Sequence, residues 1–167
     1  MPQVAVLGGD GIGPEVTAEA VKVLKEALKG ELSDWRFVEA PVGWAAIDLT
    51  DDALPEDTAK LCRESDAILF GAVGMPARDA TLPPNKRPEV VALLGLRRGL
   101  FANLRPAILY PQFVEQSVLK REIVEGGVDI LIVRELTGGL YFGRPKGREG
   151  KGEDERGVDT MVYTRAD

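Results

Sequence analysis

Apolar residues follow two repeating patterns along the chain. Short apolar runs bounded by glycine or turn residues predict strands, and apolar residues spaced by three or four predict amphipathic helices. The predicted strands are residues 3–8, 35–40, 67–70, 104–110, 128–133 and 158–164. One predicted helix begins near Pro14 and ends before Gly30, and others cover residues 54–64, 89–96 and 117–125. Because strands and helices alternate, we expect an α/β fold with a mostly parallel sheet and helices on both faces.

Three connecting segments lack either pattern. A turn-rich link that contains Asp51 and Asp52 precedes the helix at residues 54–64. Residues 75–88 contain four prolines and are predicted to form a long irregular loop, and cofactor contact is one use of such a loop. Residues 144–157 have no apolar anchor, so we expect a mobile loop there.

Composition narrows the functional classes without selecting one. The 167 residues suffice for one sizeable core, or for one domain and part of another. A net charge of −6 argues against nucleic acid or an anionic membrane as the main partner. No apolar run approaches the roughly 20 residues of a membrane span, and no signal peptide precedes the first strand. With a single cysteine, Cys62, these features predict a cytoplasmic protein.

The chain contains no histidine, which excludes several kinds of chemistry. Ser–His–Asp and Cys–His catalysis, histidine-ligated zinc and any imidazole acid–base step cannot come from these residues. Catalysis would have to use carboxylates, lysine, arginine, tyrosine, backbone amides or a metal held by oxygen ligands.

A glycine-rich segment, GGDGIGPE at residues 8–15, joins the first strand to the first helix. Strand, glycine loop and helix are the layout of an anion-binding site. However, the glycines are spaced GxGxG, whereas the dinucleotide fingerprint is GxGxxG. An anion site and a plain tight loop therefore both remain open for this segment.

The chemically richest segment is VRELTGGLYFG at residues 133–143, which follows an apolar run that predicts a buried strand. It carries Arg134 and Tyr141 on either side of a glycine turn. With Arg97 and Arg105, Arg134 could bind a di- or tricarboxylate, because each guanidinium matches a carboxylate. The alternative is a strand, a turn and an ion pair, with the arginines as separate surface residues.

Three motifs occur in the order found in a known family. GGDGIGPE, FANLRP at residues 101–106 and VRELTGGLYFG resemble the 3-isopropylmalate dehydrogenases of the isocitrate/isopropylmalate dehydrogenase family. The resemblance runs from Val4 to about Thr164, which would be the N-terminal half of a family enzyme. Isocitrate, homoisocitrate and tartrate relatives tend to have Arg-Glu-Asn where this chain has Arg-Glu-Leu-Thr.

This resemblance implies an incomplete two-domain fold. Residues 1–99 would be the N-terminal part of a first, cofactor-side domain, and residues 100–167 would begin a second domain for dimerisation and substrate binding. The complete enzyme would be a homodimer that uses NAD to decarboxylate 3-isopropylmalate oxidatively in leucine biosynthesis. Mg or Mn would be bound by residues of a missing C-terminal half, and no metal ligand is expected in this chain.

Site residues also follow from the resemblance. Arg97, Arg105 and Arg134 would hold the substrate carboxylates, with Arg98 as the alternative to Arg97, and Tyr141 would be the catalytic proton donor. Leu93 and Leu94 would face the isopropyl group. The cofactor-binding residues would be Ile12, Met75, Pro76, Arg78, Asp79 and Glu89.

Two alternatives remain beside this function. The chain ends at Asp167 without a helix over its last predicted strand, so we expect an incomplete protein that is inactive alone. It could instead be a non-catalytic remnant that binds a dicarboxylate or a partner chain through an exposed sheet. A paralogue acting on another 2-hydroxy diacid is the other alternative.

Overall fold

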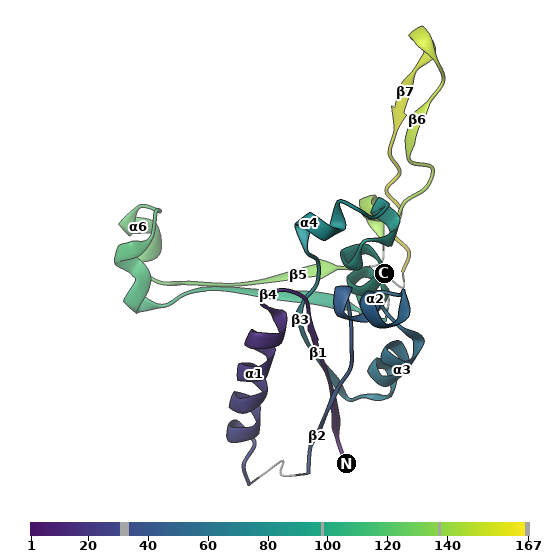
Figure 1. Ribbon diagram of the computed structural model, residues 1–167. Helices are drawn as coiled ribbons and strands as arrows, with labels where there is room; N and C mark the ends of the chain where they lie inside the picture. Colours follow the sequence, from purple (N-terminus) through teal and green to yellow (C-terminus); the bar gives the residue numbers. More distant parts are fainter. Residues whose placement is uncertain (31–33, 98, 137, 166–167) are drawn as a thin grey trace. The chain divides into compact units, whose positions relative to one another are not determined.

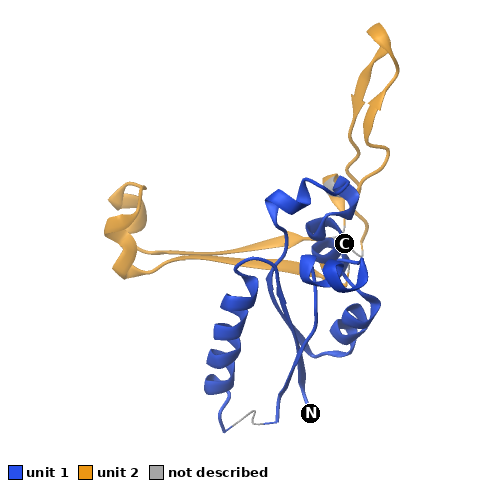
Figure 2. Ribbon diagram, viewed as in Figure 1, with its two compact units in different colours: residues 1–96 blue, residues 97–167 orange. Residues whose placement is uncertain are grey.

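The computed structural model describes residues 1–30, 34–97, 99–136 and 138–165, and the side chain of Tyr141 lies outside the described set (Figure 1). The chain divides into two compact units, Met1–Leu96 and Arg97–Asp167, shown in blue and orange in Figure 2. Each unit is described by itself.

A three-stranded parallel sheet forms the centre of the first unit. Its strands are β1 (Gln3–Gly9), β2 (Arg36–Glu39) and β3 (Ala67–Ala72), in the order β2-β1-β3. Because β1 has a neighbour on each side, its side chains at positions 4–7 are no more than 6% exposed. These strands confirm the predictions at residues 3–8, 35–40 and 67–70.

Helices cover both faces of this sheet (Figure 1). The helix α1 (Gly13–Ala27) lies on one face, and α2 (Trp44–Thr50) and α3 (Glu56–Glu64) lie on the other. Successive strand residues point to opposite faces, so alternate positions of β1 meet the two layers. The main core cluster consists of Ala5, Leu7, Val42, Ala53, Cys62 and Ala92. The α/β class and the parallel sheet with helices on both faces are thus confirmed.

The link between β2 and α3 differs from its prediction, because it contains the helix α2. This seven-residue helix is too short to show a clear periodic pattern. Its first two backbone amides are bonded by the carboxylate of Asp10, which is 34 residues earlier than Trp44. A helix stabilised by so distant a group cannot be recognised from its own residues.

Residues 75–97 are more regular than predicted. The segment expected to be an irregular loop contains the short helix α4 (Pro76–Asp79) and the 3-10 turn η1 (Pro84–Lys86). The helical prediction at residues 89–96 is confirmed by a π-helical turn, η2 (Glu89–Leu93), followed by α5 (Leu94–Arg97).

An antiparallel ribbon of two strands, β4 (Ala102–Leu109) and β5 (Val128–Glu135), begins the second unit. Both predicted strands are confirmed, but the prediction that residues 128–133 are buried is wrong. Residues 130–133 are 50–64% exposed, because β5 pairs with β4 alone among the described strands. The predicted helix at 117–125 is reduced to α6 (Arg121–Val124), which follows the 3-10 segment η3 (Pro111–Gln116).

The C-terminal part of the second unit contains the 3-10 turn η4 (Gly139–Tyr141) and a hairpin. Strands β6 (Gly147–Glu149) and β7 (Arg156–Val158) flank the 3-10 turn η5 (Gly152–Asp154). The prediction of a loop at 144–157 is therefore wrong, because two strands pair there and carry a charged cross-strand pair, Arg156–Glu149. The predicted strand at 158–164 is also wrong beyond Val158, its one residue in β7.

Candidate functional site

The glycine loop packs α1 tightly against the sheet. Gly9 and Gly11 have positive φ angles of 75° and 57°. A side chain at Gly13 would overlap the carbonyl oxygen of Gly8 and lie 2.8 Å from the amide nitrogen of Ala72. The amide of Asp10 donates to the carbonyl of Ala72 at 2.7 Å, which ties the loop to β3. Close backbone packing thus explains Gly9 and Gly13, and the positive φ angle explains Gly11.

A buried carboxylate lies in this loop. Asp10 is 5% exposed, and its Oδ1 accepts hydrogen bonds from the amides of Trp44 at 2.8 Å and Ala45 at 3.2 Å. Its Oδ2 accepts from the amide of Gly74 at 2.8 Å. The side chain of Asp10 therefore joins three segments: the glycine loop, the start of α2 and the segment after β3. The sequence motif contained Asp10, but none of its sequence neighbours indicated these partners.

Residues predicted to contact the cofactor form a cluster around Trp44. The indole nitrogen of Trp44 donates to Asp79 Oδ1 at 2.6 Å, and the guanidinium of Arg78 lies 3.9 Å from the centroid of the indole ring. Arg78 also donates to Asp48 at 2.9 and 2.5 Å. This pair lowers the pKa of Asp48, mainly through the hydrogen bond, and the same bond raises the pKa of Arg78.

The other predicted cofactor residues lie at or after the carboxyl ends of strands. Ile12 is 57% exposed beside the N-terminus of α1, and Met75 is 36% exposed three residues beyond β3. Since β1 and β3 are parallel neighbours, these two residues follow strands that end at the same edge of the sheet. Pro76 and Glu89 are exposed at the starts of α4 and η2.

The β4–β5 register places Arg105 and Arg134 on one face of the ribbon. Arg134 is opposite Asn103 and Arg105 is opposite Ile132, so the two arginines are diagonal neighbours. Arg105 Nε donates to Asn103 Oδ1 at 2.7 Å. A cavity of about 390 Å³ is lined by Arg105, Ile132, Val133, Arg134, Glu135, Gly138, Leu140 and Tyr163. Two arginines therefore line one cavity within the second unit.

Tyr163 is a residue of this cavity that the sequence pattern did not identify. A side chain at Gly139, whose φ is 70°, would overlap the hydroxyl and ring of Tyr163, and the Gly139 amide donates to the carbonyl of Val162 at 2.7 Å. Glu135 Oε1 accepts from the amide of Gly138 at 2.5 Å and so closes the turn. Only the tertiary structure shows that Tyr163 packs on the glycine turn.

The remaining predicted substrate residues are placed as follows. Leu93 and Leu94 are half-buried in the first unit, at the junction of η2 and α5. Arg97 ends α5 and is not among the residues that line the cavity of Arg105 and Arg134. Tyr141 belongs to η4, but its side chain lies outside the described residues, as does Arg98.

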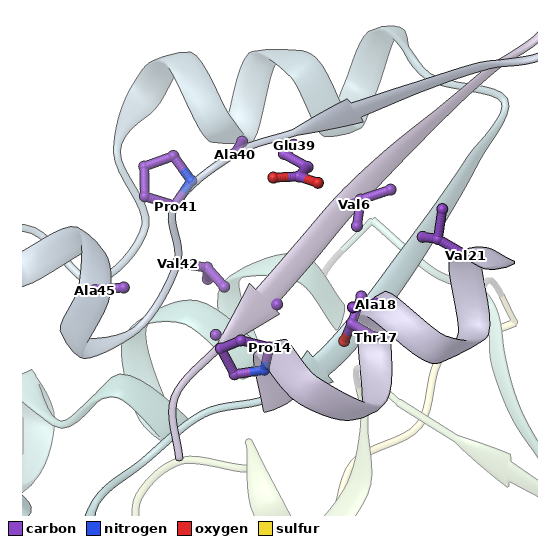
Figure 3. Close-up of a pocket in the computed structure, with 12 residues that line it drawn as sticks. Val6, Pro14, Thr17, Ala18, Val21, Glu39, Ala40, Pro41, Val42 and Ala45 are labelled. Atoms are coloured by element: carbon purple, nitrogen blue, oxygen red, sulfur yellow. The ribbon is translucent and has the colours of Figure 1, made fainter. Parts of the chain in front are cut away.

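A larger cavity of about 590 Å³ lies in the first unit (Figure 3). Its lining residues come from β1, the first turns of α1 and the segment from the end of β2 to the start of α2. The lining is mainly apolar, with the carboxylate of Glu39 and the hydroxyl of Thr17 as polar side chains. No sequence motif predicted this cavity.

The 27 Asp and Glu side chains of the chain could hold a metal ion only where several of them gather. Over residues 1–30, 34–97, 99–136 and 138–165, no three acidic or cysteine side chains gather in a way that could hold a metal ion. The described chain therefore does not fit a metal site of its own.

No helix within the described ranges is both long and apolar enough to cross a membrane.

The parallel sheet with helices on both faces, and a separate ribbon with two arginines on one face, define an α/β protein. Comparison with known proteins gives the family. The sequence profile of the isocitrate/isopropylmalate dehydrogenases matches residues 3–167, and the chain belongs to this family.

Relatives within the family agree on one enzyme name. A 3-isopropylmalate dehydrogenase of Moorella thermoacetica is 59% identical and covers 100% of the chain, and one of Syntrophotalea carbinolica is 56% identical and covers 99%. The chain in turn spans 46% of the length of each. It therefore spans about half the length of the curated relatives that it matches.

Solved structures show the same fold. A β-decarboxylating dehydrogenase from Thermococcus kodakarensis is 33% identical with a TM-score of 0.65, covering 97% of this chain and 41% of its own. An isocitrate dehydrogenase from Methylococcus capsulatus is 26% identical with a TM-score of 0.67, covering 99% and 43%.

Proposed function

We propose that this chain supplies carboxylate-binding arginines and part of the cofactor site of an NAD-dependent 3-isopropylmalate dehydrogenase. The enzyme would catalyse oxidative decarboxylation in leucine biosynthesis, in the cytoplasm and as a homodimer. The observation that carries the proposal is the register that places Arg105 and Arg134 on one face of the β4–β5 ribbon. The names of the relatives support 3-isopropylmalate as the substrate among diacids.

Arginine pairs suit this substrate for a physical reason. A guanidinium binds a carboxylate through two parallel hydrogen bonds, so two diagonal arginines can fix both the position and the direction of a diacid. Arg97 would provide the third cation. With the carboxylates fixed, the C2 hydroxyl would point to one place in the site, and NAD would supply the hydride acceptor there.

Tyr141 would act in the decarboxylation half. Loss of CO₂ leaves an enolate that must be protonated, and a phenol can donate that proton. Leu93 and Leu94 would contact the isopropyl group, where apolar contact is the basis for selectivity. Mg or Mn would be required by analogy with the family, and its ligands would come from residues outside this chain, since the described residues hold no ligand set for it.

The cofactor would approach the edge where β1 and β3 end. Ile12 and Met75 are exposed there, and Pro76 and Glu89 are exposed at helical starts that follow. Arg78 and Asp79 are already engaged by Asp48 and Trp44, so they would mainly shape the segment that meets the cofactor.

Substrate binding can be tested on the chain itself. We expect titration calorimetry to detect binding of 3-isopropylmalate, and Arg134→Ala and Arg105→Ala to weaken it roughly tenfold or more, as expected for a lost bond between charged groups. Arg121→Ala is the matched control, because Arg121 is an exposed arginine of the same unit paired with Glu115. Equal effects of all three substitutions would contradict the proposal.

Activity requires the protein as it occurs in its source organism. Its intact mass, compared with the 18.1 kDa of this chain, shows whether further residues accompany it. The isolated protein should then reduce NAD in the presence of 3-isopropylmalate and Mg, and Tyr141→Phe should slow decarboxylation more than substrate binding. No turnover by a longer protein would refute the proposed reaction.

A second candidate function rests on the exposed ribbon. Four successive apolar residues of β5, Ile130 to Val133, are at least half exposed, which favours contact with another chain. In that case the protein would be a non-catalytic binding protein. A paralogue that acts on another 2-hydroxy diacid is a separate alternative, which does not depend on the ribbon. Competition between 3-isopropylmalate, isocitrate and tartrate in the same titration separates the paralogue from the main proposal.

A further inference from the structure

We propose that Asp10 is a positioning residue that holds the cofactor-facing segment 74–79 in place, with Trp44 as a second attachment. This inference rests on the proposed function for its ligand, NAD, but its structural part can be tested without it. Asp10 is not among the residues expected to bind substrate or to react.

The two oxygens of Asp10 serve different segments. Oδ1 accepts from the amides of Trp44 and Ala45 and so holds the start of α2, while Oδ2 accepts from the amide of Gly74. Gly74 lies two residues beyond β3, directly before Met75. A single carboxylate therefore fixes the position at which the chain leaves the sheet for α4.

The surrounding backbone is shaped around this carboxylate. Gly43 has a φ of 73°, and a side chain there would overlap the carboxylate of Asp10. At 5% exposure Asp10 has little access to water that could replace a lost partner. Removing one of its bonds therefore leaves an amide unpaired that is buried at Trp44 and part-buried at Ala45 and Gly74, which is costlier than losing an exposed bond.

Trp44 holds the other end of the same segment. Its amide is bound by Asp10, and its indole nitrogen donates to Asp79 Oδ1 at 2.6 Å. The segment is thus attached at Gly74 by Asp10 and at Asp79 by Trp44. Met75 and Pro76 lie between the two attachments, so the exposed residues expected to meet NAD are fixed from both sides.

A simple capping role for α2 is the alternative, and Asp10→Asn separates the two. The amide oxygen of asparagine can still accept from Trp44 and Ala45, but its NH₂ group would face the Gly74 amide, placing two donors together. The cap survives and the link to segment 74–79 is lost. Asp66→Asn is the matched control, because Asp66 Oδ2 accepts from the Gln3 amide at 2.8 Å in the same unit.

Hydrogen exchange by NMR and NAD titration test the proposal on the full chain. We expect Asp10→Asn to speed exchange of the amides of Gly74, Arg78 and Asp79, and to weaken NAD binding about tenfold. Asp66→Asn should change neither, and 3-isopropylmalate binding should be unaffected in both variants. Unchanged exchange at Gly74, or NAD binding unchanged in Asp10→Asn, would overturn the inference.

Two outcomes need a separate measurement. If the wild-type chain does not bind NAD, the cofactor part of the proposed function fails, and the exchange data alone decide whether Asp10 holds the segment. If Asp10→Asn does not fold, Trp44→Phe replaces it, since phenylalanine keeps a ring but lacks the donor to Asp79. Faster exchange at Arg78 and Asp79 in Trp44→Phe would support the inference, and unchanged exchange would refute it.

Discussion

β1, the central strand of the first unit, and β5, the second strand of the ribbon, each contain four successive apolar residues. These residues are buried in β1 and exposed in β5. In β1, Val4 to Leu7 are no more than 6% exposed, whereas in β5, Ile130 to Val133 are 50–64% exposed. Both runs are apolar and both are paired. β1 has two neighbours and a helix layer on each face, whereas β5 pairs with β4 alone among the described strands. Burial of a strand is therefore set by how many elements surround it, which its own residues do not specify.

Because its apolar side chains are buried, the first unit depends more on side-chain packing for its stability than the ribbon does. Its core cluster draws residues from β1, the segments around α2 and α3, and η2. The apolar side chains of the ribbon contribute little to stability within this chain, because they remain in contact with water. The contrast can be tested with pairs of substitutions, one in each unit.

The largest effect is expected for Leu7→Ala. Leu7 is fully buried, so its truncation should lower the free energy of unfolding by about 2–5 kcal/mol. Ile130→Ala removes a similar side chain that is 54% exposed, and should change it by less than about 0.5 kcal/mol. Urea unfolding followed by circular dichroism measures both. Similar losses would mean that the ribbon is covered in solution.

Backbone packing gives the next effect. Gly13→Ala would place a methyl group against the carbonyl of Gly8 and the backbone of Ala72, and should destabilise the first unit by about 1–3 kcal/mol. Gly126→Ala is the control in the second unit, since nothing lies within 4 Å of its added Cβ. The same urea titration applies. A neutral Gly13→Ala would show that α1 does not pack closely on the sheet.

The rate at which a cysteine reacts with a disulfide reagent should differ between the two units, because it depends on burial. Burial raises the pKa of Cys62 from its ordinary value of 9.0, and the charge of Arg63 offsets part of this shift. The stability contributed by the neutral thiol is complete below pH 9.0 and is lost as pH rises through the folded pKa. At pH 8 we expect Cys62 to react slowly with a disulfide reagent, and quickly once unfolded. A cysteine placed by Ile130→Cys in a Cys62→Ser chain should react at once, and equal rates would contradict the contrast in burial.

The smallest effect is expected for exposed ion pairs in either unit. Asp48 has its pKa lowered by Arg78, so any stabilisation is present above its ordinary pKa of 3.8 and is lost as pH falls below it. Because solvent screens this pair, Asp48→Asn should shift the urea midpoint least. Glu149→Gln, which removes the partner of Arg156 in the hairpin, should behave alike. A large shift for Asp48→Asn alone would show that the stack on Trp44 depends on this carboxylate.

Local patterns predicted the strands of the parallel sheet and of the ribbon, but not the hairpin strands or the helix α2. The strands at 3–8, 35–40 and 67–70 were recognisable because apolar runs end in turn residues there. The hairpin at β6 and β7 was missed because a charged cross-strand pair such as Arg156–Glu149 gives no apolar signal. The helix α2 was missed because its cap, Asp10, comes from another segment.

The candidate site was likewise predicted in part from the sequence and decided in part by the tertiary structure. The sequence by itself determined the family, through three motifs whose order is preserved, and it selected Arg105 and Arg134 as candidates. Only the tertiary structure decided that these arginines share a face, that Tyr163 packs on Gly139, and that Asp10 joins three segments. The physical reason is that residue types and short periods are local properties, whereas register, burial and hydrogen-bond partners depend on segments far apart in the chain.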